Sequence, residues 1–163
     1  MQKIIIAVLV IIAALSVILY LKTSEKDVHF HSGFQIYIDG KLQDYKDAKY
    51  MSLVPCNNDD HQVETTDKVH LHDGVGSVVH VHQSNVIWND LFRYLKLDIS
   101  KIDPVEAYVN GIKINSIAEE EIQPYDSLVL LLGKHEKINT YLDAALTKEY
   151  IHDAETKSGL CKG

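Results

Sequence analysis

The segment KVHLHDGVGSVVHVHQ, residues 68–83, contains two His-x-His pairs joined by a glycine-bearing connection. Apolar residues alternate with the histidines of each pair, which is the two-residue period of a β-strand. Both histidines of a pair therefore share one face of a strand, and the apolar residues pack on the other face. The segment predicts a hairpin with strands near residues 68–73 and 77–82.

The register of this hairpin follows from parity. Directly opposed residues of an antiparallel pair share a face, and all four histidines are even-numbered, so the connection must hold an odd number of residues. A three-residue loop places His70 opposite His80. A five-residue loop places His70 opposite His82 and His72 opposite His80. Either register gathers four imidazoles on one face of the hairpin.

A third pair, His29 and His31, lies on a predicted strand over residues 28–38 and either joins this cluster or forms a second site. Three neutral imidazoles with an open position suit copper or zinc, and a fourth imidazole would close the coordination shell. The alternative is a set of solvated histidines whose charge changes with pH. The predicted ligands of a copper or zinc ion are His70, His72, His80, His82, His29 and His31. Surface positions are predicted for the isolated His61, His135 and His152.

An uncharged apolar segment, residues 4–21, is flanked by Lys3 and Lys22. As a helix it would span roughly 27 Å, just enough for the hydrocarbon of a bilayer. A cleaved signal peptide is the alternative, but no small-x-small cleavage site follows the apolar run. We therefore predict a membrane anchor over residues 1–23 and a membrane-anchored, extracytoplasmic His-rich domain over residues 24–163.

The net charge of -7, with histidines neutral, argues against a nucleic acid as partner, because no stripe of lysine and arginine could follow phosphates. Cys56 and Cys161 form no C-x-x-C motif, which excludes a thioredoxin-type redox site. A disulfide between them is predicted for an oxidising compartment, and two free thiols are the alternative.

The remaining pattern predicts an α+β fold, in which a transmembrane helix precedes a small mixed β-sheet with one or two packing helices. A two-residue turn at Asp39-Gly40 follows the first strand. The later elements expected are a helix from Ser84 or Asn85 to about Leu97, a hairpin around Asn110-Gly111, a central strand over 127–132 and a helix from Asn139 to near Ser158.

The sequences AYVNG, residues 107–111, and IQPYDSLVL, residues 122–130, resemble the second half of β-grasp domains such as the ThiS/MoaD-like sulfur carriers. This resemblance implies that the small mixed sheet is β-grasp-like. It does not extend to sulfur transfer, since those carriers end in Gly-Gly and this chain continues beyond Gly133. The part after the predicted anchor is also similar to membrane-anchored His-rich extracytoplasmic domains.

These observations predict a metal-binding module for capture, delivery or storage of an ion, without catalysis. One alternative is a zinc-dependent hydratase or hydrolase, whose three-His arrangement would resemble that of the α-class carbonic anhydrases. An enzyme needs a positioned base or carboxylate, for which Asp73, Asp67 and Glu64 are the nearest candidates. Another alternative is an anchored accessory subunit of a membrane complex. Nucleophilic catalysis is not predicted, because the chain has no G-x-S-x-G motif.

Overall fold

The computed structural model describes residues 27–52 and 68–157. Within these ranges the chain forms a mixed sheet of seven strands in the order β3-β4-β1-β7-β5-β6, with β2 paired to β1. The strands are β1 (Asp27–Ile38), β2 (Lys41–Leu42), β3 (Val69–His70), β4 (Val78–Gln83), β5 (Val105–Val109), β6 (Ile112–Ile114) and β7 (Ser127–Leu132). β1 and β7 are parallel, and the other paired strands are antiparallel.

Two predicted hairpin turns are confirmed. Asp39 and Gly40, with φ of 48° and 75°, join β1 to β2, and Asn110 and Gly111, with φ of 52° and 78°, join β5 to β6. A two-residue type I′ turn requires positive φ at both central residues, and Asp-Gly and Asn-Gly are the pairs that tolerate it best.

β7 lies in the middle of the sheet and is buried on both faces. Leu128, Leu130 and Leu132 belong to a large core that also includes residues of α2 (Trp88–Tyr94). Val129 and Leu131 belong to a smaller core, against which α3 (Ile138–Leu142) packs. Burial on both faces explains the nearly continuous apolar run and confirms the predicted central strand.

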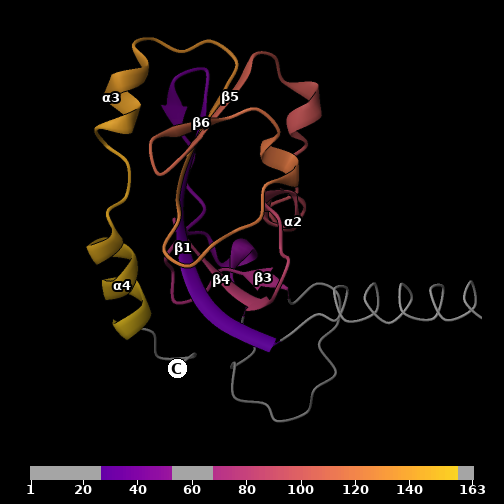
Figure 1. The fold of residues 1–163 in the computed structure, drawn as a ribbon, viewed down its shortest axis with the longest axis vertical. Coiled ribbons are helices and arrows are strands. Elements are labelled where there is room, and N and C mark those ends of the chain that lie inside the picture. The colour runs from indigo at the N-terminus through magenta and orange to yellow at the C-terminus, as the bar shows by residue number, and fades with distance from the viewer. Residues whose placement is uncertain (1–26, 53–67, 158–163) are drawn as a thin grey trace, which may run out of the picture.

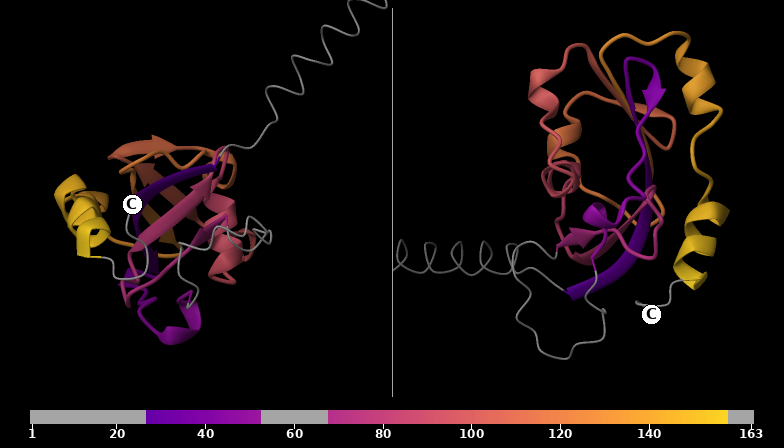
Figure 2. Two further views of the ribbon diagram at one scale, coloured as in Figure 1. Left: turned by 90° about the horizontal axis from the view of Figure 1, so that it is seen from below. Right: turned by 180° about the vertical axis from the view of Figure 1, so that it is seen from behind.

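The helices cover opposite faces of the sheet. α2 lies on one side, whereas α3 and α4 (Lys148–Lys157) lie on the other (Figures 1 and 2). α4 approaches β1 closely at Gly33, where a Cβ atom would lie 3.0 Å from the side chains of Leu146 and Ile151. The missing side chain at Gly33 therefore lets α4 pack next to the middle of β1.

The two helices predicted from the sequence are shorter than expected. A bridge between Ile87 and Glu121 keeps the chain extended before α2. The hydroxyl of Thr147 accepts a hydrogen bond from the backbone N–H of Tyr150 at 3.2 Å, so α4 begins as a separate helix after α3. Short 3₁₀ helices complete the described chain: η1 (Ala48–Tyr50), η2 (Ile99–Lys101) and η3 (Ile117–Glu119).

The predicted fold class was a transmembrane helix followed by a small, β-grasp-like mixed sheet with one or two packing helices, and it is corrected here. In the described ranges the sheet has seven strands and is accompanied by three short α-helices, because β1 is long enough to pair with β2, β4 and β7. Among these helices none is long and apolar enough to cross a membrane. The predicted anchor, residues 4–21, and both cysteines of the predicted Cys56–Cys161 disulfide lie outside the described residues.

Candidate metal centre

Five of the six histidines of the His-x-His pairs lie on three neighbouring strands, β3, β4 and β1 (Figure 1). The sixth, His72, follows the end of β3. In the antiparallel registers His80 of β4 lies opposite His70 of β3 on one side and opposite His31 of β1 on the other. The first of these pairings confirms the register predicted for the three-residue loop. His80 therefore occupies the centre of the cluster, with imidazoles on both neighbouring strands.

The residues between the histidines hold these strands in place. Val69, Leu71, Val79 and Val81 are all buried in the large core on the opposite face. A shift of either strand by one residue would turn the histidines into this core and the valines out of it. The same alternation that builds the core therefore fixes the face on which the imidazoles lie.

Among the described residues, two groups of three histidines could hold a metal ion, and in each group the donor atoms all lie within 4.8 Å of one another. We call His29, His31 and His80 the outer triad and His70, His72 and His80 the inner triad. His80 belongs to both triads. Its Nε2 contacts Nε2 of His29, and its Nδ1 contacts Nε2 of His72.

The two triads differ in their access to solvent. All members of the inner triad are buried, with exposed fractions of 6% for His70, 7% for His72 and 0% for His80. In the outer triad His31 is buried, with an exposed fraction of 2%, but His29 is exposed. The outer triad therefore has an edge at the protein surface, whereas the inner triad is enclosed.

The imidazoles of His31, His70 and His80 are held in their neutral form at neutral pH. Burial, together with the like charge of neighbouring histidines, lowers the pKa of His70 from 6.5 to about 3. Burial lowers the pKa of His31 to about 4, although the carboxylate of Glu155 acts in the opposite direction. Burial also lowers the pKa of His80 and of His29. Neutral imidazole is the form that ligates metal ions, so the folded chain presents these groups ready for coordination.

A carboxylate lies beside the inner triad. Oδ2 of Asp73 is 2.6 Å from Nδ1 of His72. With Nδ1 of His72 bonded to the carboxylate, Nε2 is the nitrogen whose lone pair could ligate an ion, and it lies next to His80. This is the arrangement found in carboxylate–histidine–metal sites. Asp73 thus contacts a candidate ligand, while the other predicted carboxylates, Asp67 and Glu64, lie outside the described residues.

A second carboxylate, Glu155 of α4, lies beside the outer triad. Its Oε1 is 3.6 Å from Nδ1 of His31, and its Oε2 accepts a hydrogen bond of 2.7 Å from the hydroxyl of Tyr125. Oε2 is also 3.5 Å from Nδ1 of His152, which is exposed as predicted. No pattern in the sequence indicates a role for Glu155, because only the packing of α4 on β1 brings it to the histidines.

His82 was predicted as a ligand, but it belongs to neither triad. Its ring stacks on that of His80, with a centroid separation of 4.6 Å and an interplanar angle of 7°. The centroid of His70 is 5.0 Å away on the other strand. The structure therefore brings five of the six predicted ligands into the two triads and places the sixth next to them.

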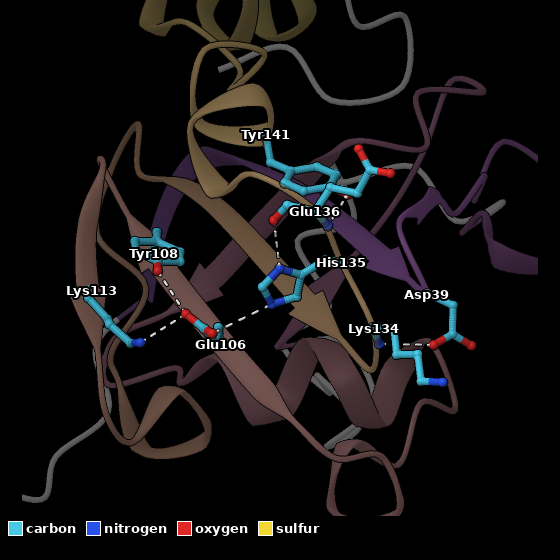
Figure 3. A network of polar contacts seen from close by, with 8 residues as sticks. All are labelled: Asp39, Glu106, Tyr108, Lys113, Lys134, His135, Glu136 and Tyr141. Atoms are coloured by element: carbon cyan, nitrogen blue, oxygen red, sulfur yellow. Dashed lines mark hydrogen bonds and ion pairs between the residues drawn. The ribbon is translucent and has the colours of Figure 1, made fainter.

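His135 lies in a different polar network, drawn in Figure 3. Its Nε2 is 3.5 Å from Oε1 of Glu106. The other carboxylate oxygen of Glu106 accepts hydrogen bonds of 2.8 Å from the hydroxyl of Tyr108 and from Nζ of Lys113. These partners lie on β5 and β6, away from the triads in the sheet order, and His61 lies outside the described residues.

Comparisons with protein families, with curated proteins and with solved structures found no match to this chain.

Proposed function

We propose that this domain binds copper or zinc through imidazole nitrogens of β1, β3 and β4 and of His72, which follows β3. The observation that carries the proposal is the pair of triads, whose donor atoms lie within 4.8 Å of one another. Ligands at about 2.0–2.1 Å from a tetrahedral ion are about 3.4 Å apart. Small side-chain rotations would therefore close either triad on an ion.

The burial of the histidines supports metal binding over a set of solvated surface imidazoles. His31, His70, His72 and His80 are all buried, although they present polar nitrogens to one another. Nε2 of His31 has no hydrogen-bond partner among the described residues. A buried polar atom without a partner costs about 1–3 kcal/mol, and coordination to an ion would remove that cost.

The chemistry of the ligand atoms and their contact with solvent support copper or zinc as the ion and a role in handling it. Imidazole nitrogen suits copper and zinc, and neutral imidazoles need no deprotonation to bind a first ion. The exposed ring of His29 gives the outer triad contact with solvent, through which an ion could enter. This arrangement fits capture, storage or delivery of an ion.

The test is calorimetric titration of the metal-free protein with Zn(II) and with Cu(II). Since His80 belongs to both triads, His80→Ala should weaken binding by more than about 100-fold, beyond what loss of a supporting partner costs. The matched control is His135→Ala, which removes an imidazole of the Glu106 network and should leave the affinity unchanged. Equal affinity in the wild type and His80→Ala, with the fold retained by circular dichroism, would overturn the proposal.

A further inference from the structure

The two ring nitrogens of His80 face different triads. Nε2 contacts Nε2 of His29, on the side of β1, and Nδ1 contacts Nε2 of His72, on the side of β3. The ring centroid of His80 lies 4.3 Å from that of His29 and 4.6 Å from that of His72. The imidazole of His80 thus lies between two pairs of histidines. His29 and His31 of the outer triad are on one side, and His70 and His72 of the inner triad are on the other.

A single ion cannot satisfy both triads through this ring. The lone pairs of the two nitrogens lie in the ring plane and point away from each other, so one ion can take only one of them. An ion held by Nδ1 of His80 with His70 and His72 leaves His29 and His31 beside a free nitrogen position. The same is true in reverse for an ion in the outer triad.

Each triad also has its own carboxylate. Asp73 contacts Nδ1 of His72 at 2.6 Å, and Glu155 lies 3.6 Å from Nδ1 of His31. The two carboxylates come from different elements, the connection after β3 and α4. Carboxylates in this position orient ligating imidazoles and add negative charge next to an ion. Each triad thus has a carboxylate of its own beside one of its histidines.

We propose that the centre binds two metal ions, one in each triad, bridged by the imidazole of His80. This inference rests on the proposed metal binding. Neutral His80 carries one N–H, so the second ion displaces that proton to solvent and leaves an imidazolate bound to both ions. The negative charges of the imidazolate, Asp73 and Glu155 then offset most of the charge of two dications in a buried site.

The experiment is a titration of the purified full chain with Cu(II), followed by metal analysis and by electron paramagnetic resonance. The first equivalent should give the spectrum of an isolated Cu(II) ion. The second equivalent should reduce the integrated signal, because unpaired electrons couple through a bridging imidazolate. Native mass spectrometry with Zn(II) should show two ions per chain.

Two variants separate the triads. His29→Ala removes a ligand of the outer triad alone, and His72→Ala removes a ligand of the inner triad alone. Each variant should bind one Cu(II) tightly and show its full signal. The control is His135→Ala, which should bind two coupled ions as the wild type does.

The wild-type protein alone decides between the outcomes, so no result depends on the folding of a variant. Two bound Cu(II) ions with a reduced signal support the bridge. Two ions with full signal intensity, or one ion per chain, overturn the bridge while leaving the proposed metal binding intact. No bound ion overturns both proposals.

Discussion

The carboxylate of Glu155 lies 3.6 Å from Nδ1 of His31 and so connects α4 with β1 at a candidate metal ligand. The hydroxyl of Tyr125 donates to the same carboxylate at 2.7 Å, which limits its freedom to turn away. The approach of α4 at Gly33 makes this contact possible. α4 therefore supplies part of the candidate metal centre in addition to covering the sheet.

Glu155→Gln should lower the affinity of the outer triad for its ion by about 10–100-fold, because the neutral amide no longer raises the basicity of His31. Stability should change little, since the amide oxygen can still accept from Tyr125. The measurement is a competition titration with Zn(II). Glu149→Gln, an exposed change on the same helix, is the control and should match the wild type. Equal affinity in both variants would show that Glu155 has no influence on the ion.

Asp73→Asn should lower the affinity of the inner triad for its ion by a similar factor, about 10–100-fold, because His72 loses a charged partner at 2.6 Å. Asp73 has a φ of 55°, a conformation that asparagine also adopts, so the turn should survive. Asp39→Asn makes the same change at a φ of 48° in the β1–β2 turn and serves as the control. If the two variants bind Zn(II) equally well, the Asp73 contact does not support a ligand.

The stability of the metal-free domain should fall with pH below about 6.5. Burial lowers the pKa of His70 to about 3 and of His31 to about 4, whereas in the unfolded chain both titrate near 6.5. Between these values the unfolded chain binds more protons than the folded chain, so protonation favours unfolding as the pH falls. This contribution is complete above pH 6.5 and is lost progressively toward pH 3.

Urea unfolding of the metal-free protein at pH 7.5 and at pH 5 measures this effect, and the midpoint should be lower at pH 5. His31→Gln removes one titrating group and should reduce the difference between the two midpoints. A midpoint that is the same at both pH values would mean that the histidines become charged without loss of the fold.

His82→Ala should change metal affinity by less than about 10-fold, whereas His80→Ala should abolish tight binding. The ring of His82 stacks on His80 but belongs to neither triad, so its removal leaves both sets of three donors complete. Parallel titrations of the two variants with Zn(II) provide the comparison. A loss in His82→Ala as large as that in His80→Ala would identify His82 as a ligand, as the sequence predicted.

The part of the site that the sequence predicted depends on local alternation. Val69 and Leu71 on one strand and Val79 and Val81 on the other must face the core, so the even-numbered histidines had to share the opposite face. The odd loop length then left two registers, and the structure has the one predicted for the three-residue loop, with His70 opposite His80. Both steps use only the two-residue period of a strand, which residues 68–83 carry clearly.

The part that the sequence did not predict depends on packing between distant segments. Nothing near Glu155 in the sequence indicates a partner on β1, because α4 reaches His31 through the contact at Gly33. The register of β1 against β4 also shifts between Asp27 and Phe30, next to His29. Such irregularities change the direction of a side chain, and they follow from the whole sheet rather than from a local pattern.

Gly76→Ala should both destabilise the domain and weaken metal binding. A Cβ atom at Gly76 would lie 2.5 Å from backbone atoms of Tyr45 and Lys46, so the connection between β3 and β4 would have to move. Overpacking of this kind costs about 1–3 kcal/mol in the free energy of unfolding. The displaced connection carries His72 at its start, so the inner triad should lose its geometry.

Gly111→Ala is the control: its φ of 78° is unfavourable for alanine by about 1–2 kcal/mol, but a Cβ there meets nothing within 4 Å. Urea unfolding should show a loss of stability in both variants, and Zn(II) titration should show weaker binding only in Gly76→Ala. Unchanged affinity in a destabilised but folded Gly76→Ala protein would show that the inner triad does not depend on this close contact.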